Sequence, residues 1–139
     1  MHAVVVALVA VLAAGCGGGE AAAEMSDELH FVRSGGFAGQ HDELTIRPNG
    51  DVSLVSRDGQ QEQFSLSDEE MTNLTGVLED TGLEDIPSDS TSEGPVPDAF
   101  TYVVTYGETE VRTDDASVPE ELTNLLSQLI DIVEGQRSQ

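Results

Sequence analysis

One stretch decides the fold: ELTIRPNGDVSLV, at residues 43–55. Polar and apolar residues alternate on both sides of Pro48-Asn49-Gly50, which is the pattern of two strands that each bury one face. Proline sets φ for the first position of a turn and glycine supplies its left-handed residue, so a bulged three-residue loop joins the strands. The stretch therefore predicts an antiparallel hairpin.

Further strands are predicted on both sides of this hairpin. Residues 29–33 and a short segment ending at 64–66 flank it, and residues 100–106 and 109–113 form a second hairpin around Gly107-Glu108. Together these segments predict an antiparallel sheet of about four to five strands.

Two amphipathic helices accompany the sheet. Residues 67–70, Ser-Asp-Glu-Glu, form a capping box, apolar residues then repeat at helical spacing, and Gly82 ends the helix. A second helix opens at 117–121 and carries leucines on one side. The sequence predicts one α+β domain over residues 27–135, with both helices on one face of the sheet.

The composition limits the classes of partner. All 5 basic residues are arginines, against 27 Asp and Glu, for a formal charge of −22. Because no basic patch can neutralise phosphates, nucleic acid is excluded as a partner, and cations, salt or basic proteins remain. The single cysteine excludes an intrachain disulfide, and with 3 histidines it is too few for a Cys/His zinc cluster.

The amino terminus resembles a bacterial lipoprotein signal. Residues 3–14 are 12 consecutive Ala, Val or Leu, too few to cross about 30 Å of hydrocarbon, and Gly15-Cys16 follows them. We expect residues 1–15 to be a signal peptide, Cys16 to be acylated, and residues 16–26 to be a flexible tether. Since only His2 precedes the apolar run, we expect the basic residues of the signal upstream. The alternative is a lone buried cysteine in a cytoplasmic helix beside three glycines.

No residue pattern indicates an enzyme, a metal or a cofactor. No serine lies in a Gly-x-Ser-x-Gly elbow, and the sequence contains no Asp-x-Asp-x-Asp-Gly calcium loop. His30 lies in a predicted strand and His41 in a predicted loop, where solvation or packing accounts for both. Carboxylate pairs such as Asp114-Asp115 are expected by chance at this acidic density.

Ser34-Gly35-Gly36-Phe37-Ala38-Gly39 has three glycines in six residues and two interpretations. In the first, it is a bulged turn whose glycines adopt positive φ and whose Phe37 folds inward as a core plug. In the second, it is a narrow protruding loop, and Phe37 is an apolar anchor for a partner.

Three segments in order resemble the emfourin family, small protein inhibitors of protealysin, a thermolysin-like zinc metallopeptidase. Arg33-Ser34-Gly35-Gly36-Phe37-Ala38-Gly39 resembles its opening signature, 97–102 its second, and 118–126 its terminal helix. The resemblance implies that residues 33–39 form an inhibitory surface that occludes a peptidase cleft. It implies structural roles for Pro97, Asp98, Phe100 and Tyr102. Family members are commonly less acidic than this chain and lack a lipid signal. Both differences bear on which peptidase this chain would inhibit.

The expected function is thus a lipid-anchored inhibitor of a thermolysin-like zinc metallopeptidase, on the extracytoplasmic face of the membrane. The main alternative is a non-enzymatic envelope lipoprotein that binds a small ligand or a cation between the sheet and the 87–97 loop. An envelope structural protein is the third possibility.

The lipid anchor predicts a simple change of phase. Expressed in a bacterium that processes lipoproteins, the wild-type chain should enter the detergent phase of a Triton X-114 partition. Cys16→Ser should move it to the aqueous phase, because acyl chains supply the membrane affinity. A wild-type protein that is exported and yet entirely aqueous would contradict acylation.

Overall fold

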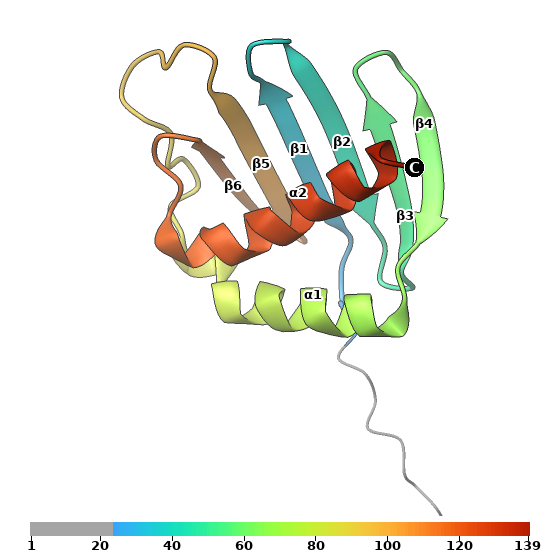
Figure 1. Cartoon of the computed structure of the whole chain (residues 1–139). Coiled ribbons are helices and arrows are strands. Elements are labelled where there is room, and N and C mark those ends of the chain that lie inside the picture. Colours follow the sequence, from blue (N-terminus) through green and yellow to red (C-terminus); the bar gives the residue numbers. More distant parts are fainter. Residues whose placement is uncertain (1–23) are drawn as a thin grey trace, which may run out of the picture.

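The computed structural model describes residues 24–139, so the expected signal peptide and Cys16 lie outside the described residues. Within them the chain forms an α+β domain with six strands and two α-helices (Figure 1). The strands are β1 (Leu29–Gly35), β2 (Gln40–Ile46), β3 (Asp51–Ser56), β4 (Gln61–Ser65), β5 (Phe100–Tyr106) and β6 (Thr109–Asp114). The helices are α1 (Asp68–Thr81) and α2 (Thr123–Arg137), each beside a short 3-10 turn, at Leu83–Asp85 and Glu120–Leu122.

All six strands form one antiparallel sheet in the order β4-β3-β2-β1-β5-β6. The expected four to five strands were too few. The short β4 pairs with β3 along its whole length, with Phe64 opposite Val52 and Gln61 opposite Val55, and so makes a full edge strand. β1 lies in the middle of the sheet, between β2 and β5.

The hairpin predicted at residues 43–55 is confirmed. Ile46 pairs with Val52 and Thr45 with Ser53 across β2 and β3. The backbone N–H of Gly50 donates to the carbonyl of Arg47 at 2.9 Å, and Gly50 has a φ of 87°. This left-handed conformation is the one for which glycine was expected at that position.

The predicted ends of the first helix are also confirmed. The Ser67 hydroxyl accepts the N–H of Glu70, while the Glu70 carboxylate accepts the backbone N–H of Ser67 at 2.7 Å. Gly82 ends α1 in the left-handed conformation. On its inner face Leu74 is buried as expected, and so is Thr75, whose hydroxyl is satisfied by the carbonyl of Met71 at 2.8 Å.

The core lies between the sheet and α2, which crosses the sheet in Figure 1 with α1 beside it. Alternate residues of each central strand point into this layer and meet the leucines of α2. The fully buried apolar residues are Leu29, Phe31, Leu44, Ile46, Val52, Leu54, Leu74, Val104, Val111, Leu122, Leu125, Leu129 and Val133. Met25 is buried too, so the chain already packs on the domain there. None of the helices within residues 24–139 is long and apolar enough to cross a bilayer.

At one end of this layer an ion pair replaces the apolar core. Arg33 of β1 and Asp42 of β2 face each other across the strands and are 5% and 0% exposed. Arg33 donates to Asp42 through Nε at 3.1 Å and Nη2 at 2.9 Å, and its Nη2 also reaches Glu134 of α2 at 2.6 Å. Arg137 of α2 bonds the other oxygen of Asp42. The pair therefore joins two central strands to the end of α2.

Charge is retained at the centre of this network. Burial works to lower the pKa of Arg33, but hydrogen bonds to Glu134 and Asp42 outweigh it and raise that pKa above its ordinary value. No buried side-chain nitrogen or oxygen of the described residues is left without a hydrogen bond. Burial of charge costs desolvation energy, and that cost becomes large when one partner is removed, so the buried members depend on each other.

Removal of the shared carboxylate should be strongly destabilising. Asp42→Asn is expected to lower the free energy of unfolding by about 3 kcal/mol, because two guanidinium groups lose their common partner. Urea denaturation at fixed salt measures the loss. Arg47→Gln is the matched control: Arg47 pairs with Glu28 at 3.6 Å on the surface, and its loss should cost less than about 1 kcal/mol. Equal, small losses in both variants would contradict a stabilising role for the buried pair.

Candidate functional site

The turn between β1 and β2 lies directly beyond the ion pair. Gly35, Gly36 and Gly39 have φ values of 104°, 71° and 60°, as the bulged-turn interpretation expected. A methyl group on Gly35 would lie 2.6 Å from the carbonyl oxygen of Ala99, and one on Gly36 would lie 2.6 Å from the ring of Phe100. These two glycines thus allow the start of β5 to approach the turn closely.

Phe37 points out of the protein, with 94% of its surface exposed. The interpretation of Phe37 as a core plug is therefore wrong. The physical reason is Phe100, whose ring covers Gly36 and lies 5.2 Å from the guanidinium carbon of Arg33. Because Phe100 fills the space beneath the turn, Phe37 has no room inside.

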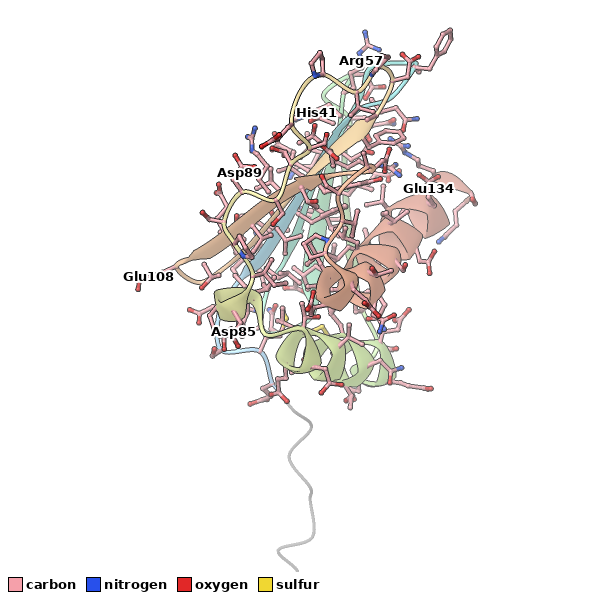
Figure 2. All side chains as sticks on the ribbon, turned by 90° about the vertical axis from the view of Figure 1, so that its left-hand side faces the viewer. His41, Arg57, Asp85, Asp89, Glu108 and Glu134 are labelled. Atoms are coloured by element: carbon pink, nitrogen blue, oxygen red, sulfur yellow. The ribbon has the colours of Figure 1, made fainter. Side chains whose placement is uncertain are left out.

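The turn at residues 36–39, here named the Phe37 tip, is held from two sides. On one side the N–H of Gly36 donates to the carbonyl of Ala99 at 3.2 Å. On the other, Nη1 of Arg57, from the turn between β3 and β4, donates to the carbonyl of Ala38 at 2.6 Å. Figure 2 shows Arg57 at this end of the domain, with Asp85 and Glu108 toward the opposite end. The Phe37 tip is thus braced by both neighbouring loops.

Two aspartates hold the segment at residues 86–99, here named the long loop, which braces the Phe37 tip. Asp114 accepts the backbone N–H of Ser92 at 2.8 Å and its hydroxyl at 2.6 Å. Asp115 accepts the backbone N–H of Phe100 at 2.8 Å and the hydroxyl of Tyr102 at 2.5 Å. Burial, with the carboxylate of Asp115, raises the pKa of Tyr102 and keeps its hydroxyl a donor. These neighbouring carboxylates are therefore structural groups rather than a chance pair.

The structure brings the residues of both signature segments to one end of the sheet. Arg33 lies under the Phe37 tip in the ion pair, and Ser34 and Gly35 end β1. Beside them, Pro97 and Asp98 belong to the adjoining loop, where Asp98 has a φ of 59°. Phe100 and Tyr102 lie on β5, with ring centroids 6.3 Å apart.

Some residues of this end were not identified from the sequence. Arg57 was not singled out, because no local pattern shows that it reaches Ala38. Asp42 was not singled out, because the predicted strand began at residue 43, whereas β2 begins at Gln40 and places Asp42 on its inner face. His41, expected in a loop, lies in β2 and bonds Glu43 at 2.8 Å.

Two hollows adjoin the Phe37 tip and the long loop. The first, of about 610 Å³, is polar and is lined by Ala38, His41, Arg57, Arg137 and several glutamines. The second, of about 420 Å³, lies between residues 89–99 and β6 and is lined by Asp89, Ser92, Arg112 and Asp114. Residues 24–139 contain no group of three His, Cys, Asp or Glu side chains that could hold a metal ion.

The fold and the site define a small α+β domain that presents a rigid turn with an apolar tip. No protein-family model matches the chain, and no curated protein matches it. The function is therefore inferred from the arrangement of the residues themselves.

The contribution of Asp114 to the anchoring of the long loop should depend on pH. Hydrogen bonds from Ser92 lower the pKa of Asp114 from 3.8 to about 2. A carboxyl group with a lower pKa in the folded state stabilises the fold above its unfolded pKa and loses that contribution as the pH falls through the folded value. The difference in unfolding free energy between the wild type and Asp114→Asn should thus be constant above about pH 5 and shrink toward pH 2.

Urea denaturation at a series of pH values measures this difference. Ser92→Ala is the matched variant, since it removes the hydroxyl donor but leaves the carboxylate in place. Ser92→Ala should lower the free energy of unfolding by part of the amount that Asp114→Asn does. The stability of this variant should depend less on pH than that of the wild type. A difference that stays constant down to pH 2 would contradict the anchoring role of Asp114.

Proposed function

We propose that this protein inhibits a thermolysin-like zinc metallopeptidase by inserting the Phe37 tip into the active-site cleft. The observation that carries the proposal is the 94% exposure of Phe37 at the end of a turn braced on both sides. A large aromatic side chain in water adds nothing to the stability of the domain. It is the kind of side chain that dominates binding energy when a partner buries it.

The shape of the turn suits a peptidase cleft. Such a cleft binds an extended chain beside its metal and has an apolar pocket next to it. Phe37 supplies the group that fills the pocket, and Gly35 and Gly36 let the turn behind it pack closely on Ala99 and Phe100. Because the hydrogen bonds of Gly36 and Ala38 order the turn before binding, little conformational entropy is lost on association.

Occlusion is a better mechanism here than capture of the metal. A zinc peptidase holds its ion with preorganised ligands and a supporting shell of hydrogen bonds. Two carboxylates near the Phe37 tip are held by the domain itself: Asp42 by two arginines, and Asp115 by Phe100 and Tyr102. The proposed inhibitor therefore leaves the zinc in place and blocks access to it.

The proposed site of action is the extracytoplasmic membrane surface, with a lipid on Cys16 as the anchor. β1 begins at Leu29 and runs to Gly35, so the Phe37 tip lies at the far end of this strand from the amino-terminal side of the domain (Figure 1). This orientation favours access of a peptidase to the tip.

We also propose that α1 and α2 both lie on one face of the sheet.

A second candidate function has one observation in its favour. The hollow of about 420 Å³ between the long loop and β6 is where a small ligand or cation was expected to bind. Arg112 and Asp89 line it, so the ligand of this alternative would be small and polar. A non-enzymatic envelope lipoprotein of this kind needs no peptidase, and an inhibition assay separates the two functions.

Truncation of Phe37 should abolish most of the inhibition and leave the fold intact. Phe37→Ala is expected to raise the inhibition constant by at least about thirtyfold, which is the effect of losing a central aromatic contact. Its free energy of unfolding should stay within about 0.5 kcal/mol of the wild type, as for other exposed positions. Inhibition of thermolysin and protealysin by the purified full chain, with urea denaturation alongside, measures both.

Three controls accompany this measurement. Phe37→Leu keeps an apolar side chain and should retain more of the inhibition than Phe37→Ala. Glu108→Gln changes the exposed turn between β5 and β6, toward the opposite end of the sheet, and should have no effect (Figure 2). Added zinc should not relieve inhibition by the wild type. If the wild type inhibits neither enzyme at micromolar concentration, the inhibitor function is abandoned in favour of the binding lipoprotein.

A further inference from the structure

A second apolar side chain is exposed on the loop that adjoins the Phe37 tip. Among residues 24–139, Phe37 and Val96 are the large hydrophobic residues with exposed side chains, at 94% and 41%. Val96 belongs to the loop at residues 94–99, here named the Val96 loop. The exposed apolar surface of the domain thus comes from two adjoining loops.

Hydrogen bonds fix the two loops relative to each other. The N–H of Ala99 donates to the carbonyl of Val96 at 3.4 Å, and the carbonyl of Ala99 accepts the N–H of Gly36 at 3.2 Å. The absence of a side chain at Gly35 lets the Ala99 carbonyl approach the turn. Val96 and Phe37 therefore belong to one connected unit.

The Val96 loop is also ordered internally. Pro95 and Pro97 flank Val96, and each ring restricts φ to about −65°. Behind the loop, Asp114 holds Ser92 and Asp115 holds Phe100. Val96 is thus presented in one conformation, although its side chain contributes little to the core.

The charges around the two apolar side chains differ. Glu93 and Asp98 are exposed on either side of Val96 in the chain. Arg112 lines the same hollow as Val96, but Asp89 and Asp114 line it too, so acidic side chains outnumber basic ones around this loop. Arg57 lies on the other side of the Phe37 tip, bonded to Ala38. A partner that fits this end must therefore meet an acidic border around Val96 and a basic side chain beyond Phe37.

We propose that the Val96 loop is a second part of the docking surface, an inference that rests on the proposed function. The peptidase would bury Phe37 in its cleft and Val96 in an apolar recess on the rim, bordered by Lys or Arg side chains. Phe37 then supplies most of the affinity, and the Val96 loop selects among peptidases by the charge of their rims.

The test measures inhibition of thermolysin and protealysin by the full chain and its variants. Val96→Ala removes two methyl groups and should weaken inhibition about tenfold with an enzyme that the wild type inhibits. Val96→Thr keeps the shape but adds a hydroxyl and should also weaken it. Because Val96 is exposed, both variants should unfold at the same urea concentration as the wild type.

A charge variant tests the acidic border. Glu93→Gln with Asp98→Asn should slow association several-fold at low salt, and the difference should vanish near 1 M salt, where the screening length is about 3 Å. Asparagine tolerates the positive φ of Asp98, so the loop is expected to keep its shape. Glu108→Gln with Glu110→Gln is the control, since it changes the net charge by the same amount away from the Val96 loop.

The possible outcomes separate the two proposals. If Phe37→Ala weakens inhibition but the Val96 and charge variants inhibit like the wild type, the Val96 loop has no role in docking and the proposed function stands. If the wild type inhibits neither enzyme, the proposed function fails and the second contact fails with it. Weaker inhibition by the Val96 variants, with Glu108→Gln unchanged, supports the two-loop surface.

Discussion

The buried ion pair between Arg33 and Asp42 is the interaction on which the rest of the structure depends. It joins β1 to β2 at the point where their turn begins, and Glu134 and Arg137 connect it to the end of α2. Arg33 and Asp42 are the buried members, and loss of either one weakens the pairing of the other, at a cost of about 3 kcal/mol. The network thus holds β1, β2 and α2 together at the end of the sheet, where the apolar core stops.

The same pair determines how Phe37 is displayed. The guanidinium of Arg33 lies over the ring of Phe100, and Phe100 covers Gly36 beneath the turn. With this space filled, the turn is braced by Ala99 on one side and Arg57 on the other, and Phe37 extends into solvent. A rigid display of this kind binds a partner with a small loss of entropy, which is the physical basis of the proposed inhibition.

The distribution of the few arginines adds a reason for the location of the site. The chain has 27 acidic and 5 basic residues, and Arg33, Arg57 and Arg137 all lie at the end that carries the Phe37 tip. Much of the remaining surface is acidic, for example the first turn of α1 with Asp68, Glu69 and Glu70. Asp42 and Glu134 neutralise Arg33 and Arg137 there, so Arg57 is the exposed basic side chain that a partner meets beside the turn.

The sequence by itself determined the local elements of this protein. The hairpin at residues 43–55, the capping box at Ser67 and the positive φ of Gly35 and Gly36 follow from interactions between residues close in the chain. Only the tertiary structure decided the direction of Phe37, because that depends on Phe100 from a distant strand filling the space below the turn. It also decided the partners of Asp42, since Arg137 is 95 positions away and the alternating pattern of β2 shows only that Asp42 faces inward. Periodicity and turn chemistry act over a few residues, whereas the outward display of an aromatic side chain depends on what distant segments place beneath it.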